Sequence, residues 1–301
     1  MSTTISEATG KPYGVQRVCD TWEMPRSSYY KRKDRTLESP VLQKRGPKTL
    51  ISDDELLTLI RDDLATSLFI GEGHRKVWGR IRFIKEIKVG RKRVLRIMQQ
   101  NNLLSPHRVV QGEKQEHKGK ISTQVPNDMW GTDGTKIFTI DDGWCWLFTA
   151  VEHWNAECVG WHIAKTGDRF AALQPLSMAV NQRFGSVGKD AARGLTLRMD
   201  NGSQYLSEHF QNQIKFWGIA PSFAFVSQPQ TNGVAERFNR TLKEQVVYGR
   251  TYRNIEELRV AVTAFMERYN QHWLVEKLGY RSPNQAYRAL QRFKWVEHIA
   301  C

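Results

Sequence analysis

A change of hydrophobic period partway along the chain limits the fold more than any other feature. Residues 129–140, 144–151 and 158–164 read as three strands, and an Asp-Asp-Gly turn joins the first two. Helices and short strands then alternate, with helices at 168–184, 207–217, 234–248 and 254–269 and strands at 194–199 and 219–226. Three meandering strands followed by this alternation predict an α/β domain whose mixed sheet is covered by helices.

The chain before residue 127 shows helical spacing only. A capping box of Ser52 and Glu55 opens one helix, and two more are predicted around residues 76–87 and 91–101. Two shorter helices are predicted within residues 13–33. Polar stretches that contain proline and glycine read as linkers. The predicted domains are a short helical segment with a basic linker at 1–50, a helical domain at 51–104, a linker at 105–126 and the α/β core at 127–301.

The charge is distributed unevenly between these parts. The 45 Lys and Arg exceed the 31 Asp and Glu, which gives a formal net charge of +14. Residues 1–126 hold 25 basic and 14 acidic residues, a net of +11, and residues 127–301 hold 20 and 17, a net of +3. Ten basic residues lie between His74 and Arg96 beside one acid, Glu86. A solvated helix face is the plain interpretation, but such dense charge favours a polyanion, nucleic acid before an anionic membrane surface.

We therefore expect residues 51–104 to be an all-α, helix-turn-helix-like DNA-binding domain. Its candidate phosphate contacts are Arg75, Lys76, Arg80, Arg91, Lys92 and Arg93.

Other classes of protein are disfavoured. The four cysteines are scattered and form no C-x-x-C pair, so neither a zinc knuckle nor a disulfide framework is predicted. A reducing cytosol is the default compartment. No secretory signal pattern is visible, and no apolar run approaches the ~18 residues that a membrane span needs.

Three carboxylates are candidate metal ligands. Asp133 lies within the first strand, Asp200 follows the strand at 194–199, and Glu236 lies at the start of a helix, with 35 residues between it and Asp200. Cleavage of a phosphodiester with magnesium uses two cations ~3.5–4 Å apart, held by carboxylates from separate elements. Arg240 and Lys243 share the helix face of Glu236 and suit DNA phosphates.

These residues lie in blocks with a family likeness. The blocks are W-x-x-D-x-T at 130–135, D-N-G-S-Q-Y at 200–205, P-Q-T-N-G-V-A-E-R-F-N at 229–239, L-G-Y-R-S-P at 278–283 and G-H-R-K-V-W-G-R-I at 73–81. Together with the 35-residue spacing and Lys243, they resemble the OrfB-type transposases of bacterial insertion sequences. These are DDE transposases of the retroviral-integrase superfamily. Gly134 departs from the pattern, because a β-branched residue is usual there.

The resemblance implies a ribonuclease-H-like mixed sheet with flanking helices, preceded by an all-α helix-turn-helix region. It implies that Asp133, Asp200 and Glu236 are catalytic and bind two Mg²⁺ ions, for which Mn²⁺ can substitute. Water would cut a strand at the element's end, and the freed 3′-hydroxyl would attack a second strand. The implied partners are double-stranded DNA (terminal inverted repeats and target), further copies of the chain on DNA, and an OrfA-type protein or fusion.

Two alternatives stay open from the residues alone: a non-catalytic DNA-binding regulator derived from a transposase, and a structure-selective nuclease of the same fold. Four tryptophans are expected in the core under the sheet, namely Trp144, Trp146, Trp154 and Trp161. Glu152 and Glu157 border strands and are expected to be exposed.

Overall fold

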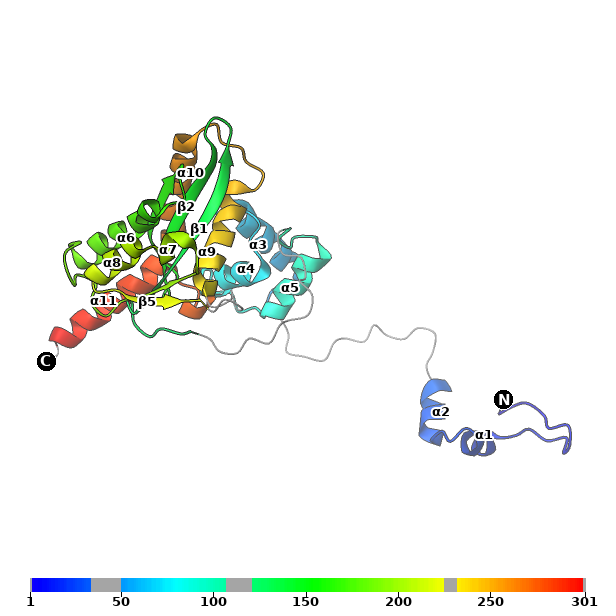
Figure 1. The fold of residues 1–301 in the computed structure, drawn as a ribbon. Helices are drawn as coiled ribbons and strands as arrows, with labels where there is room; N and C mark the ends of the chain where they lie inside the picture. Colours follow the sequence, from blue (N-terminus) through cyan, green and yellow to red (C-terminus); the bar gives the residue numbers. More distant parts are fainter. Residues whose placement is uncertain (1, 34–49, 107–120, 225–231, 300–301) are drawn as a thin grey trace. The chain divides into compact units, whose positions relative to one another are not determined.

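The computed structural model describes residues 2–33, 50–106, 121–224 and 232–299, with side chains described up to Arg292. The chain divides into two compact units, Met1–Leu50 and Ile51–Cys301 (Figure 1). Most of the two predicted linkers lies outside the described residues, as does most of the loop before the helix of Glu236. No helix in the described part is long and apolar enough to cross a membrane.

The first unit contains the two short helices that the sequence predicts. They are α1 (Val15–Thr21) and α2 (Arg26–Lys33). Pro25 directly precedes α2, where a missing N–H and a fixed φ are compatible with a helix start. Cys19 is the buried residue of α1.

The second unit is built around a five-stranded sheet in the order β3-β2-β1-β4-β5. The strands are β1 (Met129–Thr139), β2 (Gly143–Glu152), β3 (Cys158–Ala164), β4 (Thr196–Met199) and β5 (Ala220–Phe223). The first three pair antiparallel, and β4 pairs parallel to β1 and β5. The predicted meander and mixed sheet are therefore confirmed.

Helices cover both faces of this sheet (Figure 1). One face packs on α6 (Arg169–Phe184), α7 (Ser203–Leu206) and α8 (Glu208–Phe216) around a core that includes Trp130 and Phe148. The other packs on α9 (Gly233–Leu242), its π-helical continuation η3 (Lys243–Val247) and α10 (Ile255–His272) around Phe238 and Phe265. The short η4 (Glu276–Leu278) and α11 (Pro283–Ile299) follow. Each face of the strands is apolar because each has its own helical layer to bury against.

Gly134 has a packing reason in this sheet. It pairs across the strands with Phe148, whose ring stacks on Trp146 with centroids 5.6 Å apart. A Cβ at Gly134 would stand 2.7 Å from the Phe148 ring. The departure from the family pattern therefore makes room for an aromatic pair on the neighbouring strand.

Three helical segments precede the sheet within the same unit. They are α3 (Asp53–Thr66), α4 (His74–Gly79) continued by the π-helical η1 (Arg80–Ile84), and α5 (Arg91–Gln100). The capping box is present, with the Glu55 N–H donating to Ser52 Oγ and the Ser52 N–H donating to Glu55 Oε2. A small core that includes Leu56, Val77 and Met98 holds the three segments together.

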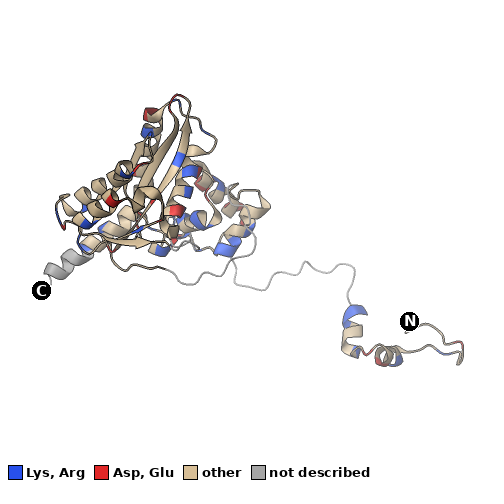
Figure 2. Cartoon of the chain, viewed as in Figure 1, with Lys and Arg blue, Asp and Glu red and all other residues tan. Residues whose placement is uncertain are grey.

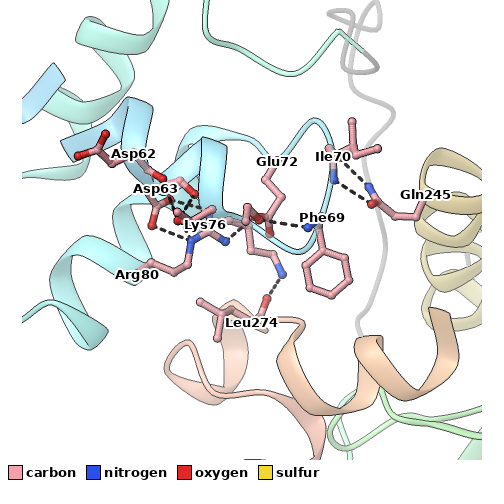
Figure 3. A network of polar contacts seen from close by, with 11 residues as sticks. Asp62, Asp63, Phe69, Ile70, Glu72, Lys76, Arg80, Gln245 and Leu274 are labelled. Carbon is pink, nitrogen blue, oxygen red and sulfur yellow. Dashed lines mark hydrogen bonds and ion pairs between the residues drawn. The ribbon is translucent and has the colours of Figure 1, made fainter. Parts of the chain in front are cut away.

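This helical region packs on the α/β core (Figure 3). The Gln245 side chain donates to the Ile70 carbonyl at 2.7 Å and accepts from the Ile70 N–H at 2.9 Å. Phe69 packs edge-on against Trp273 with centroids 4.9 Å apart. Lys76 Nζ donates to the Leu274 carbonyl. Residues 51–104 and the core thus share one compact unit, and the domain boundaries between them stay predictions.

Three expectations about burial are wrong. Glu152 is 2% exposed, because its carboxylate accepts from the Trp130 indole at 3.0 Å and from two backbone N–H groups. Glu157 is 7% exposed and pairs with Arg183. Trp144 is 61% exposed at the hairpin end, whereas Trp146 and Trp161 are half-buried and pack against the core as expected, and Trp154 is half-buried. Trp130 fills the core instead.

Candidate active site

The three predicted carboxylates come from neighbouring elements. Asp133 lies in the middle of β1, Asp200 directly follows β4, and Glu236 lies in the first turn of α9. The parallel pairing of β1 with β4 sets Gly131 opposite Arg198, and Asp133 and Asp200 each follow this pair by two residues. Because α9 packs across β1 and β2, Glu236 is carried to the same sheet face.

Electrostatics show that these three groups lie close enough to influence one another. Burial raises the pKa of Asp133, and the charge of Asp200 raises it further. Burial also raises the pKa of Glu236, with additional increases from the charges of Asp133 and Asp200. Tyr205, fully buried nearby, has its pKa raised by burial and by the same two aspartates. The charge of Asp200 therefore acts on both Asp133 and Glu236, and that of Asp133 acts on Glu236.

Hydrogen bonds hold the two aspartates. Asn239 Nδ2 donates to Asp133 Oδ2 at 2.8 Å, and the Gly134 N–H donates to Asp133 Oδ1 at 2.9 Å. The Gly202 N–H donates to Asp200 Oδ1 at 2.9 Å. Asp133 is half-buried, whereas Asp200 and Glu236 are exposed and open to solvent.

The donor set fits a hard divalent cation, although the carboxylates are not closed around one. Among the described residues, no group of three or more His, Cys, Asp or Glu side chains is drawn close enough to hold a metal ion. Within the same residues, none of these three carboxylates forms an ion pair with Lys or Arg. Carboxylates without an ion-pair partner, two of which (Asp133 and Glu236) have a raised pKa, would be stabilised by Mg²⁺ or Mn²⁺.

Two basic residues of the same helix border the cluster. Arg240 is exposed and its charge lowers the pKa of Glu236, while Lys243 is half-buried and its charge lowers the pKa of Asp133. They follow Glu236 by about one and two helical turns, as the sequence predicts. Helix α5 also carries Lys and Arg, which are blue in Figure 2; in that view, labelled in Figure 1, α5 lies to the right of α9.

The predicted DNA contacts of the helical region fall into two groups. Arg75 and Arg91 are exposed and share Glu276 at 3.0 and 3.1 Å, and Lys92 is exposed without an ion pair inside the described ranges. These three side chains face solvent and remain candidates for phosphate contact.

The other three basic residues are engaged inside the unit. Arg80 pairs with Asp63 and Glu72, and Arg93 pairs with Asp53. Lys76 donates to a backbone carbonyl and lies over the Trp273 ring, 3.5 Å from its centroid. These three charges have partners within the unit, so their contact with DNA stays a prediction that competes with these internal contacts.

Sequence reasoning missed two polar residues of the site. Asn239 follows Glu236 by three residues and so shares its helix face, which is a signal that the sequence does contain. Thr149 lies on β2 directly opposite Asp133, and only the strand register reveals that neighbour.

Comparison with known proteins agrees with this geometry. The family description "Integrase core domain" matches residues 124–229, and a second description of the same name matches residues 217–283. The transposase InsD for insertion element IS2A/D/F/H/I/K of Escherichia coli is 31% identical over 230 residues, covering 72% of this chain and 73% of that protein. The chain belongs to the OrfB-type transposases of insertion elements. The family predicted from the motifs is confirmed, and this transposase is an enzyme of the polynucleotidyl-transferase type.

Two further similarities complete the comparison. The transposase is 31% identical over 243 residues to the 48.2 kDa uncharacterized protein of insertion element IS2A of Escherichia coli, and the match spans only 53% of that protein. Its fold is similar to the HTLV-2 integrase catalytic core domain solved in complex with magnesium, at 18% identity and a TM-score of 0.41. That match covers 54% of this chain and 97% of that one. The five-stranded mixed sheet with helices on both faces has the predicted α/β class, and helical segments precede it.

Proposed function

We propose that this transposase binds the ends of its insertion element and catalyses metal-dependent strand cleavage followed by strand transfer. The observation that carries the proposal is the convergence of Asp133, Asp200 and Glu236 on one sheet face, beside Arg240 and Lys243. Family membership supports the class of reaction, and the cluster supplies the residues that would perform it.

Each side chain has a role that its surroundings support. Asp133, Asp200 and Glu236 would hold two Mg²⁺ ions, or Mn²⁺ in their place. When bound, the pair activates the attacking oxygen and stabilises the leaving oxygen of an in-line displacement. Asn239 holds the Asp133 carboxylate by its hydrogen bond, and Gly202 holds Asp200 through its backbone N–H.

The basic residues would bind the polyanionic substrate. Lys243 acts on the charge of Asp133 and Arg240 on that of Glu236, and both would neutralise phosphates that flank the scissile bond. Arg75, Arg91 and Lys92 are exposed on the helical region and would bind phosphates further along the duplex. Contacts to phosphates release counterions, so binding should weaken steeply as salt rises.

The proposed partners are double-stranded DNA, in the form of terminal inverted repeats and target, and further copies of the transposase assembled on that DNA. An OrfA-type protein or a fusion to it is a further proposed partner.

Labelled duplexes that end in the candidate terminal repeat test this function, with Mg²⁺ and an unlabelled target. Wild type should nick the end and join it to the target. Asp133→Asn, Asp200→Asn and Glu236→Gln should each abolish both products while end binding stays nearly intact. Binding without any nicking would identify a regulator, and nicking without joining would identify a nuclease. Strand transfer retained by one of the three variants would remove that residue from the site.

A further inference from the structure

A buried threonine stands beside the active site without a role in the proposed chemistry. Thr149 pairs directly with Asp133 across β1 and β2, so both side chains point to the same sheet face. Thr149 is fully buried, and its hydroxyl donates to Asn239 Oδ1 at 3.1 Å. Asn239 is 5% exposed and donates from its other amide atom, Nδ2, to Asp133 Oδ2 at 2.8 Å.

The direction of these two hydrogen bonds, from Thr149 to Asn239 and from Asn239 to Asp133, follows from the chemistry of the groups. An ionised carboxylate only accepts hydrogen bonds, whereas an amide has one donating and one accepting end. Asn239 must therefore turn its NH₂ group toward Asp133, which leaves its oxygen facing Thr149. The hydroxyl proton of Thr149 satisfies that buried oxygen. Without the Thr149 hydroxyl, the Asn239 amide oxygen would be buried without a hydrogen-bond donor, which would favour rotation of the amide away from Asp133.

Asn239 lies on the same helix, α9, as other residues of the site. Asn239 follows Glu236 by three residues and precedes Lys243 by four, so the three share one face of the continuous helix. The link from β2 through Asn239 to β1 fastens this face of α9 over the two strands.

We propose that Thr149 is a positioning residue for the metal-binding carboxylates, acting through the amide of Asn239. This inference rests on the proposed function, because it assigns Thr149 to the carboxylate site of that reaction. Thr149 touches neither DNA nor a reacting atom in the proposal. A second approach of its hydroxyl, to the Asp133 carbonyl, is at 3.5 Å and is too long to replace the contact with Asn239.

Isosteric variants separate the hydroxyl from the shape of the side chain. Thr149→Val keeps the β-branched form that suits a strand but removes the hydroxyl, whereas Thr149→Ser keeps the hydroxyl. Thr139→Val is the matched control, because Thr139 is also fully buried in the sheet and donates to the Gly143 carbonyl at 3.1 Å, near the hairpin turn.

Two measurements on the intact chain test the proposal without DNA. The first is Mn²⁺ affinity, measured by titration. Loss of a group that orients metal ligands should raise the Mn²⁺ dissociation constant of Thr149→Val about 10-fold or more, with Thr149→Ser and Thr139→Val near wild type. The second is the exchange rate of the Asn239 side-chain amide protons in metal-free, ¹⁵N-Asn-labelled protein, which should rise only in Thr149→Val.

Unchanged Mn²⁺ affinity in a folded Thr149→Val protein would overturn the proposal, as would equal effects of Thr149→Ser and Thr149→Val. If Thr149→Val does not fold, Thr149→Ala and Asn239→Ala provide a double-mutant cycle. Residues that act in series should show no added loss of Mn²⁺ affinity in the double variant, and additive losses would refute the proposal that Thr149 acts through Asn239. If wild type bound Mn²⁺ but transferred no strand, the proposed function would fail, while the Mn²⁺ affinities of the variants would still test whether Thr149 acts through Asn239.

Discussion

Replacing Arg80 with methionine distinguishes an internal ion-pair partner from a DNA contact. The Arg80 guanidinium donates to Asp63 through Nε, at 3.0 and 2.9 Å, and through Nη2, at 2.7 Å, and it also pairs with Glu72 (Figure 3). The side chains of Asp63 and Glu72 are 4% and 1% exposed, and that of Arg80 is 17% exposed. Methionine retains much of the apolar stem but leaves two buried carboxylates beside each other without a cation.

Removal of one partner from a buried ion pair destabilises a protein by roughly 3–5 kcal/mol, because the remaining charge is uncompensated. Two carboxylates depend on Arg80, so we expect a loss toward the upper end, about 4–5 kcal/mol. At a urea dependence of about 2 kcal/mol per molar, that loss lowers the unfolding midpoint by roughly 2 M. Trp78, whose indole donates to the Val89 carbonyl at 2.8 Å, supplies a fluorescence probe in the same region.

Arg75→Met is the matched control for this substitution. Arg75 is 61% exposed, and its one ion pair with a described residue is to Glu276, itself 46% exposed, so its loss should change the stability by no more than about 1 kcal/mol. If Arg80→Met were as stable as Arg75→Met and instead bound DNA more weakly with a reduced salt dependence, Arg80 would be a phosphate contact and our reasoning would be wrong.

Three further outcomes follow from the charges. Lys92→Ala should weaken binding of any duplex and lower the slope of log affinity against log salt by about 1, measured by anisotropy at several salt concentrations. Glu276→Gln should tighten DNA binding, because it frees Arg75 and Arg91 from a competing carboxylate; weaker binding would contradict this. Burial raises the pKa of Glu152 above 4.5, so the folded state favours the neutral form of this side chain, and protonation of Glu152 stabilises the fold. The contribution is fully present below pH 4.5 and is lost as pH rises through the raised value, and the stability of wild type relative to Glu152→Gln, from urea unfolding, should fall over that range.

Much of the fold was predictable because its signals are local. Alternating apolar residues mark the three long strands, and the Ser52–Glu55 capping box marks the start of a helix. The prediction failed at Glu152, Glu157 and Trp144, whose burial depends on segments distant in the chain. Glu152, for example, is buried because the Trp130 indole and two backbone N–H groups surround it.

The sequence by itself determined the transposase family and singled out Asp133, Asp200 and Glu236 as the predicted metal ligands, because family motifs and their spacing are local features of the chain. It also determined that basic charge concentrates before the sheet, because charge is a property of composition. Only the tertiary structure decided which cations have acidic partners inside the unit, since Arg80 and Arg93 find their acids through folding. It likewise decided that Thr149 stands behind Asp133, because strand register and helix packing join residues that no local pattern connects.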